Sequence, residues 1–450
     1  MSQALQTYRY LRPSAVLDGA AGPGLALSTS GGGGPAGAGV HPGFFSGFLT
    51  APAPAAAALL AVADVAAARY HLPQRRASLD PVVTANGDRL RFESFSGCGG
   101  VHARLDVLAG GLDGGEIGHG TTNVDVNNPL RESLSLVGGA DPLHLAVGAD
   151  GLAATTLDGQ VVEKKVPLPD RWLRGFAETQ VVTAGFEPRA ELPAAEAVRF
   201  LRALPRGGRG QAAWVVPAGR TLRATSRPVP GAVCLPGPER LAALHRVLRH
   251  AVGLRVYGPP AGPVPAASAW EVALPGMRLT LTLSPDVSRG FSGEGGVLAA
   301  LAAEGSAADA ELVATLLAWE PVIDPAELAE QAGITVARVR AALGRLGTAG
   351  QIGYDPAEAA YFHRQLPYDA GRAEAHNPRL RAARALVAAG AVRWDGELAT
   401  VTVDDHHQRV RRAADGALSC TCRWWAHYRG GRGPCKHVLA AGLVPVEGKR

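Results

Sequence analysis

Short runs of alternating apolar and polar residues dominate the chain between residues 89 and 287, and Gly, Pro and Asp separate them. This alternation is typical of half-buried β-strands, and it predicts strands at 90–95, 143–147, 160–163, 213–216 and 277–283. Helical spacing of apolar residues lies between these runs, at 171–177, 194–203 and 238–250. Strands interspersed with helices in this way predict a mixed α+β body.

The N-terminal part of the chain has a different pattern. Its Gly-rich stretch, 31–39, lacks the fixed glycine spacing and the Lys-Ser or Lys-Thr pair of a phosphate-binding loop, which favours a flexible segment. The alanine-rich run 55–70 predicts a helix, because alanine has the highest helix propensity. We therefore divide this part into an N-terminal segment, residues 1–75, and the α+β body, residues 76–305.

Beyond residue 308 the pattern changes to helices. The apolar spacing predicts helices at 309–319, 325–331 and 335–346, then a two-stranded wing at 351–354 and 360–363. Asp324 and Thr335 are the expected N-caps of the second and third helices. The set resembles a winged helix-turn-helix unit, which we place at residues 306–370. The fold class is thus α+β and multidomain.

This unit has two interpretations. In a DNA reader, the third helix enters the major groove, where Arg338, Arg340 and Arg345 would touch bases or phosphates. In an interaction module, the same arginines form a solvated face. Acidic residues in the first two helices, such as Glu311 and Glu327, repel a phosphate backbone and weigh against DNA reading.

Composition narrows the class of protein. Hydrophobic residues make up 47% of the 450 residues and charged residues 19%, which excludes disorder throughout. The start of the chain carries no secretory signal, and the most apolar stretch, 51–68, contains Pro52, Pro54 and Asp64, so that no membrane span is expected. Five cysteines are too few for a disulfide scaffold. We expect a cytoplasmic protein whose cysteines are free thiols or metal ligands.

The formal net charge of +5 is unevenly distributed. Residues 371–450 hold fourteen basic and seven acidic residues, a balance of +7, whereas the other 370 residues hold 31 basic and 33 acidic residues, a balance of −2. The excess of positive charge therefore belongs to the C-terminal eighty residues.

Those eighty residues also contain the most specific motif in the sequence. Cys420, Cys422, Cys435 and His437 form the pattern C-x-C-x12-C-x-H. Zinc takes four ligands in a tetrahedron, and three sulfurs favour zinc over calcium or magnesium. Because protein ligands fill all four positions, no place remains for a catalytic water. The motif predicts one structural zinc ion, with Cys435 and His437 at the start of a helix.

At these residues the sequence resembles a SWIM zinc finger, which we place at residues 371–450. The strand-like runs 400–403 and 408–412 and the apolar helix after His437 fit that family. The resemblance implies that Cys420, Cys422, Cys435 and His437 are the zinc ligands. It also implies an association with DNA binding or with protein binding.

A wider resemblance covers most of the chain from residue 89. Segments such as 92–96, 121–125, 172–176 and 361–364 are similar to a bacterial, largely actinobacterial, SWIM zinc finger protein family. Members of that family tend to be encoded beside MoxR-type AAA ATPases and von Willebrand factor A proteins. The resemblance implies an adaptor with such partners, and it implies no enzyme.

Basic and aromatic residues are interleaved around the expected zinc ligands. The candidate nucleic-acid or partner-binding residues are Arg411, Arg412, Arg423, Trp424, Trp425, Tyr428, Arg429, Arg432 and Lys436. Such a mixture can hold phosphates by charge and unpaired bases by ring stacking. It can equally anchor a protein, because Trp, Tyr and Arg dominate interface hot spots. Both interpretations stay open at this point.

Cys98 is the candidate for an enzyme, with His102 and His119 as possible bases. A cysteine nucleophile needs a base within hydrogen-bond distance, and nearness in sequence does not provide one. Cys98 lies in a turn-like run of small residues, where a small side chain simply fits. His406 and His407 follow two aspartates in an expected hairpin turn. The sequence thus predicts a zinc-binding interaction protein and assigns no catalytic residue. A DNA-binding protein is the alternative, and an enzyme that uses Cys98 is the second alternative.

Overall fold

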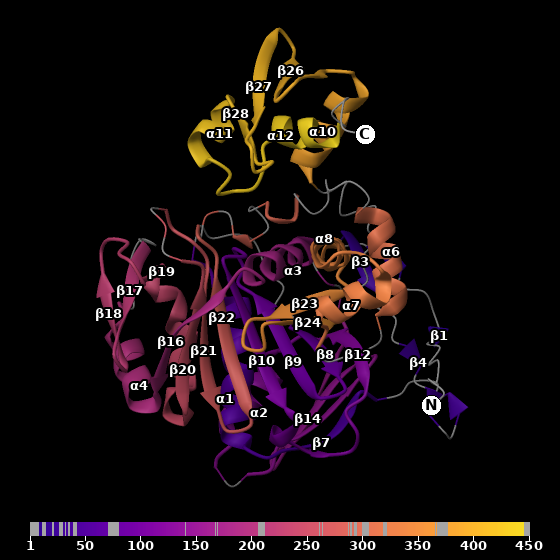
Figure 1. Ribbon diagram of the computed structural model, residues 1–450. Helices are drawn as coiled ribbons and strands as arrows, with labels where there is room; N and C mark the ends of the chain where they lie inside the picture. Colours follow the sequence, from indigo (N-terminus) through magenta and orange to yellow (C-terminus); the bar gives the residue numbers. More distant parts are fainter. Residues whose placement is uncertain are drawn as a thin grey trace.

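A computed structural model shows how the elements are arranged (Figure 1). It describes residues 43–444 except 71–80, 140, 167, 169, 206–211, 261, 263, 287, 289, 292–294, 299–305, 318–321, 365 and 367–376. It also describes short strands near the N-terminus: β1 Arg9–Tyr10, β2 Ala15–Gly19, β3 Gly22–Ala26, β4 Ser30–Gly31, β5 Gly33–Gly34 and β6 Gly37–Ala38. Much of the Gly-rich stretch 31–39 lies outside the described residues.

An eight-stranded antiparallel sheet forms the centre of the body, in the order β12-β8-β9-β10-β22-β21-β20-β16. Its strands are β8 Val82–Asn86, β9 Arg89–Phe95, β10 Val101–Leu108, β12 His119–Asn123, β16 Glu187–Pro193, β20 Gly253–Gly258, β21 Ser268–Leu274 and β22 Met277–Leu283. The predicted strands at 90–95 and 277–283 lie in this sheet. Every residue of β8, β9 and β22 is buried, so both faces of the sheet are covered there.

Two smaller sheets complete the strands of the body. A five-stranded sheet has the order β11-β7-β13-β14-β15, with β7 Phe45–Leu49, β11 Leu112–Gly114, β13 His144–Gly148, β14 Gly151–Thr156 and β15 Gly159–Lys164. A three-stranded sheet has the order β18-β17-β19, with β17 Ala212–Ala218, β18 Thr221–Thr225 and β19 Val233–Pro236. The predicted strands at 143–147, 160–163 and 213–216 are therefore present.

Helix α1, Pro52–Ala67, packs on β9 and β10 and is buried in the main core along nearly its whole length. Its small alanine side chains let the helix lie close to the sheet. The helix was expected within residues 1–75 as part of a separate segment, and instead it lies in the core of the body. The other helices of the body are α2 Asn128–Leu136, α3 Asp170–Thr183 and α4 Ala194–Ala203.

The predicted helix at 238–250 is wrong in type. The chain forms two 3₁₀ segments there, η2 Pro238–Arg246 and η3 Leu248–His250; a further short 3₁₀ segment, η1, spans Ala109–Gly111. The physical reason is a tertiary contact near the start of η2. The guanidinium of Arg240 is buried and donates hydrogen bonds to the carbonyl oxygens of Gly100 and Ser284, which ties the segment to the sheet.

Three helices and a hairpin follow the body: α6 Ser306–Leu316, α7 Pro325–Ala332, α8 Val336–Thr348, β23 Ile352–Asp355 and β24 Ala360–His363. Both predicted N-caps are confirmed. Asp324 Oδ1 accepts a hydrogen bond from the Ala326 N–H at 2.7 Å, and Thr335 Oγ1 accepts one from the Arg338 N–H at 3.3 Å. The second and third helices and the hairpin match their predicted segments within two residues, whereas the first helix begins and ends three residues earlier than predicted, and residues 318–319 lie outside the described residues.

The hairpin β23–β24 lies against the eight-stranded sheet (Figure 1). The alternation of side chains along β9 accounts for this contact. Leu90 and Phe92 face the main core, while Arg91 and Glu93 face the side on which the hairpin lies. Arg104 donates to Asp355 of the hairpin at 2.6 Å, and Arg278 donates to the same carboxylate at 2.9 Å. The hairpin is therefore buried against the body.

Helix α8 is also engaged by the body. Its C-terminal half, including Leu343 and Leu346, is buried, and the helix packs against α3. On its other half, Arg338 forms an ion pair with Asp309 of α6 at 2.6 Å. Arg340 is exposed and Arg345 is half-buried.

The C-terminal module sits at one end of the body, drawn in yellow in Figure 1. Its elements are α10 Pro378–Ala388, β25 Val392–Asp395, β26 Leu398–Val403, β27 His406–Arg412, β28 Leu418–Cys420, α11 Arg423–Tyr428 and α12 Lys436–Leu443. The four strands pair in sequence order as an antiparallel sheet. His406 and His407 were expected in the hairpin turn, but they begin β27, and the turn consists of Asp404 and Asp405.

An apolar cluster attaches this module to the body. Ala177 and Val297 pack there with Leu380 of α10 and Leu439 of α12. The backbones also approach closely, because a side chain at Gly433 would overlap the Gly295 carbonyl. No helix in the described part of the chain is long and apolar enough to cross a membrane.

Candidate metal centre

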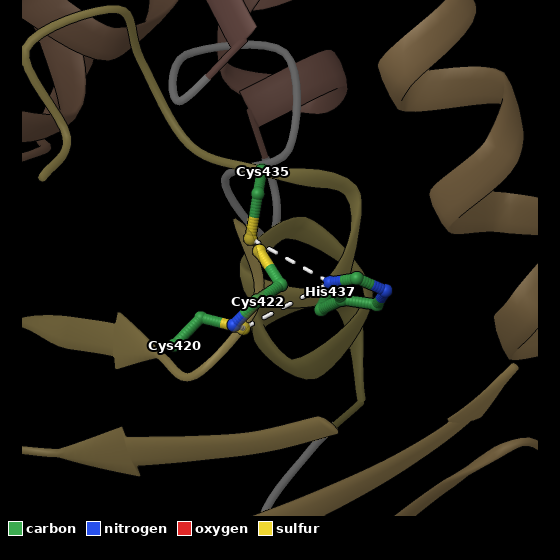
Figure 2. A group of neighbouring side chains, drawn as sticks. All are labelled: Cys420, Cys422, Cys435 and His437. Atoms are coloured by element: carbon green, nitrogen blue, oxygen red, sulfur yellow. Dashed lines mark hydrogen bonds between the residues drawn. The ribbon is translucent and has the colours of Figure 1, made fainter. Parts of the chain in front are cut away.

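The four predicted zinc ligands come from three elements of the C-terminal module. Cys420 ends β28, Cys422 is the N-cap of α11, Cys435 is the N-cap of α12, and His437 lies in the first turn of α12. Figure 2 shows their side chains directed toward one another. All four residues are buried. The predicted helix after Pro434 is present as α12.

The distances fit one metal ion. One ligand atom from each residue lies within 4.8 Å of the others. Nδ1 of His437 is 3.8 Å from Cys420 Sγ and 3.9 Å from Cys435 Sγ. In a tetrahedral zinc site with bonds of about 2.3 Å, ligand atoms lie roughly 3.7 Å apart. The cluster therefore fits one structural zinc ion with Nδ1 as the histidine ligand.

Helix N-termini support the negative charge of the sulfurs. Cys422 Sγ accepts a hydrogen bond from the Trp425 N–H, and Cys435 Sγ accepts one from the Val438 N–H, both at 3.4 Å. Cys420 Sγ accepts from the Cys422 N–H at the same distance, which is the bend that lets both residues face one ion. Backbone donors and the positive end of a helix stabilise a thiolate.

The thiols differ in their readiness to ionise. A hydrogen bond from Cys420 lowers the pKa of Cys435 to about 4, and the same hydrogen bond, together with burial, raises the pKa of Cys420 above its ordinary value. Burial also raises the pKa of Cys422. A cation bound by the three sulfurs would favour their ionisation.

Comparison with family models agrees with this geometry. The model described as SWIM zinc finger matches residues 400–441, which begin within β26 and end within α12. Residues 400–441 are a SWIM zinc finger domain. The four ligands all lie within this match, and together the match and the cluster fit one structural zinc. No curated protein matches the chain.

Solved structures resemble part of the chain only weakly. The proliferating cellular nuclear antigen of Entamoeba histolytica matches with a TM-score of 0.36 and 10% identity, over 54% of this chain and 100% of that one. The PCNA2–PCNA3 complex of Sulfolobus tokodaii matches with a TM-score of 0.38 and 11% identity, over the same shares.

Cations cover the aromatic residues of the SWIM finger. The guanidinium carbons of Arg379 and Arg432 lie 4.7 and 4.8 Å from the centre of the Trp424 ring. Arg432 also lies 4.6 Å from the ring of Tyr428. The same pattern recurs on the strands, where Arg412 lies 4.7 Å from the ring of Trp394. Trp425 is half-buried and packs against the cluster that holds the ligands.

Arg379 is the functional residue that the sequence interpretation missed. Besides its contact with Trp424, its Nη1 donates to the carbonyl oxygens of Arg432 at 2.7 Å and of Pro434 at 3.1 Å. It therefore links α10 to the segment that leads into Cys435. No local signal marks it, because it lies more than forty residues before its partners in the sequence.

The remaining predicted binding residues differ in exposure. Arg411, Arg423 and Arg429 are exposed, and Lys436 is half-buried beside the ligands. Arg429 ends α11 in the left-handed conformation, with φ of 44°.

Cys98 and His102 are engaged with different partners. Cys98 is half-buried, and its Sγ lies 3.4 Å from Ser96 Oγ, its one hydrogen-bond contact among the residues that the structure describes. His102 is buried, with Nε2 3.2 Å from Glu93, whose other oxygen accepts from Arg364. Burial lowers the pKa of His102. His119 begins β12, on the far side of β8 and β9 from β10.

Proposed function

We propose that the protein is an adaptor that binds a partner protein through its zinc-stabilised SWIM finger. Its partners are an AAA ATPase of MoxR type and a von Willebrand factor A protein, as the family resemblance implies for a bacterial chain. The five unpaired cysteines, three of them zinc ligands, suit a reducing cytoplasm. In this proposal the zinc ion has no catalytic part, and it holds the binding surface in shape.

One observation favours a protein partner over a nucleic acid. Arg379 and Arg432 lie over the Trp424 ring, and Arg432 lies over Tyr428 as well. Base stacking needs a free ring face, and here a base would have to displace a cation. For a protein partner, by contrast, the same guanidinium and ring pairs form a preorganised surface, made of the residue types that dominate interfaces.

DNA binding is the second candidate, and it has support of its own. Residues 371–450 carry a balance of +7, and Arg411, Arg423 and Arg429 are exposed on the finger. The hairpin β23–β24 argues against DNA binding by a wing. This expected wing is buried against the body, where Asp355 accepts hydrogen bonds from arginines of the sheet. The DNA alternative therefore rests on the SWIM finger alone.

Affinity purification of the full chain from its native host, with and without nuclease, separates these candidates. The adaptor is expected to retain the same protein partners after nuclease treatment, and Cys435→Ser is expected to lose them. Cys98→Ala is the matched control, because it removes a thiol outside the finger. Partners that disappear with nuclease would favour the DNA candidate, and a wild-type chain that retains no protein would contradict the adaptor.

A further inference from the structure

An open cavity lies beside the metal centre of the SWIM finger. Its volume is about 580 Å³, within the range of roughly 300–1,000 Å³ that ligand sites occupy. Four parts of the finger surround it: the start of α10, the hairpin of β26 and β27, and the starts of α11 and α12, where the zinc ligands Cys422, Cys435 and His437 form part of the lining. We call it the SWIM groove, and the residues that matter here are Pro378, Ala382, Val403, Gln408, Arg423 and Lys436.

The groove has apolar walls and two uncommitted cations. Pro378 and Ala382 of α10 face the groove together with Val403 of β26. Arg423 and Lys436 also line it, and the side chain of neither has a hydrogen bond or ion pair with any residue that the structure describes. Such a combination suits a ligand with an anionic group next to an apolar group.

The charge balance limits how many anionic groups fit. Arg379, Arg423 and Lys436 bring three positive charges to the groove, and Asp404 brings one negative charge. Three thiolates around one Zn²⁺ add one further negative charge at the base of the groove. The formal excess of about one positive charge suits a single carboxylate, whereas a nucleic-acid strand brings a phosphate with every nucleotide.

Polar groups in the groove suit a peptide backbone. Gln408 uses its Oε1 to accept a hydrogen bond from Thr421 at 3.2 Å, which leaves its amide N–H groups as donors. Asp404 and His406 at the hairpin are exposed and can take further backbone contacts. Trp424 also lines the groove, with the cations of Arg379 and Arg432 over its ring.

We propose that the SWIM groove binds a short extended segment of a partner protein in which an acidic residue adjoins an apolar one. The carboxylate pairs with Arg423 and Lys436, and the apolar side chain lies on Pro378, Ala382 and Val403. This inference rests on the proposed adaptor function and names the chemistry that its finger recognises.

Fluorescence anisotropy of the zinc-loaded full chain tests the proposal. The probe is a fluorescein-labelled peptide of alternating Glu and Leu, and its matched partner carries Gln in place of every Glu. The Glu peptide is expected to bind about tenfold more tightly than the Gln peptide, because the Gln peptide cannot pair with the cations. Equal binding of the two peptides would overturn the proposal.

Two variants locate the binding. Arg423→Glu combined with Lys436→Glu is expected to weaken binding of the Glu peptide by about tenfold or more, whereas Arg393→Glu, an exposed arginine outside the groove, is expected to change it by less than about twofold. Zinc content per chain is measured for each variant. If the double variant loses zinc, Ala382→Phe fills the groove away from the ligands and is expected to abolish binding.

Further outcomes distinguish a peptide from a nucleic acid as the ligand of the groove, and failure of the groove proposal from failure of the adaptor function. A single-stranded oligo-dT that displaces the Glu peptide and loses affinity in the same variants would overturn the choice of a peptide. If the native partners still co-purify with the Ala382→Phe chain, the groove proposal fails while the adaptor function stands. If the wild-type chain retains no partner at all, the adaptor function fails, whatever the peptide does.

Discussion

Several arginine side chains of the body are buried against carboxylates, whereas those around Trp424 in the SWIM finger lie over an aromatic ring. Arg104 and Arg278 both donate to Asp355 of the hairpin, while Arg379 and Arg432 lie over Trp424. A carboxylate neutralises the charge of an arginine, whereas an aromatic ring does not. The same residue type therefore joins layers of the body and, in the proposed function, forms a binding surface in the finger.

The finger also contains the one Cys/His cluster that fits a metal ion among the described residues. Its own apolar cluster is small, and it includes the three zinc-ligand cysteines. The body has a large apolar core besides its ion pairs. The comparison predicts that the two regions respond differently to loss of zinc, to acid and to loss of single arginines.

The largest expected effect is that of Cys435→Ser. Loss of a structural zinc ion removes on the order of 10 kcal/mol of folding free energy from a small zinc module. The finger is expected to unfold while the body stays folded. Zinc content per chain, together with hydrogen exchange of the full-length protein, measures this. Cys98→Ala is the control and should keep one zinc ion; protected finger amides in the zinc-free Cys435→Ser chain would contradict the prediction.

Asp355→Asn is expected to have the next largest effect. Asp355 is buried, and its carboxylate accepts from Arg104 and Arg278, with Arg91 3.7 Å away. Removing one partner of a buried ion pair costs about 3–5 kcal/mol, because the remaining charges stay buried. Urea denaturation measures the free energy of unfolding. Glu311→Gln on the exposed face of α6 is the control, and an equal effect there would argue against the ion cluster.

The carboxylate of Asp355 also makes the stability of the body decrease at acidic pH. Although burial opposes ionisation, the surrounding arginines, Arg104 first among them, hold the pKa of Asp355 well below its ordinary value of 3.8. A depressed pKa contributes stability that is present above the ordinary pKa and is lost as pH falls toward the folded one. We expect the wild-type body to lose stability below about pH 4, and Asp355→Asn to show a weaker loss. Parallel slopes for the two proteins would refute this.

Arg379→Ala is expected to have a smaller effect in the finger. It removes the cation over Trp424 and two hydrogen bonds to carbonyl oxygens, which together contribute about 1–2 kcal/mol. Hydrogen exchange in α11 and in the segment before Cys435 should become about five- to thirtyfold faster. Arg381→Ala, on the exposed face of the same helix, is the control and should leave exchange unchanged.

The smallest effect concerns a body carboxylate that has no arginine beside it. Burial, with a contribution from Asp125, raises the pKa of Glu163 to about 7. Its folded form holds a proton that the unfolded chain releases, so stability falls as pH rises from 4.5 to 7. Glu163→Gln should reduce the difference in the free energy of unfolding between pH 5 and pH 8 by about 1 kcal/mol, as measured by urea denaturation at both pH values. Glu132→Gln, exposed on α2, should keep the dependence.

Patterns over short stretches predicted much of the fold. The helix 194–203 and the strand 360–363 match their predicted bounds, and Asp324 and Thr335 cap the helices as expected. The prediction at 238–250 was wrong in type because a buried arginine ties that segment to the sheet. Local patterns succeed where local contacts decide the conformation, and they fail where a distant contact does.

The metal centre could be predicted almost completely from sequence. Cys420 and His437 are seventeen positions apart, and short turns bring all four ligands to one ion. The surface around it could not be predicted in the same way. Arg379 reaches this surface from α10, and its contact with Trp424 depends on how that helix packs against the finger. The nine predicted partner-binding residues remain a prediction, and their six cations now divide into two that lie over rings, three that are exposed and one that is half-buried.

The sequence by itself determined the zinc ligands, the local helices and strands, and the placement of the positive charge in the last eighty residues. Only the tertiary structure decided that the hairpin faces the body, that arginines cover the rings of the finger, and that a groove opens beside the metal. The physical reason is separation along the chain. Arg104 and Asp355 are 251 residues apart, and only the packing of whole layers brings such residues into contact.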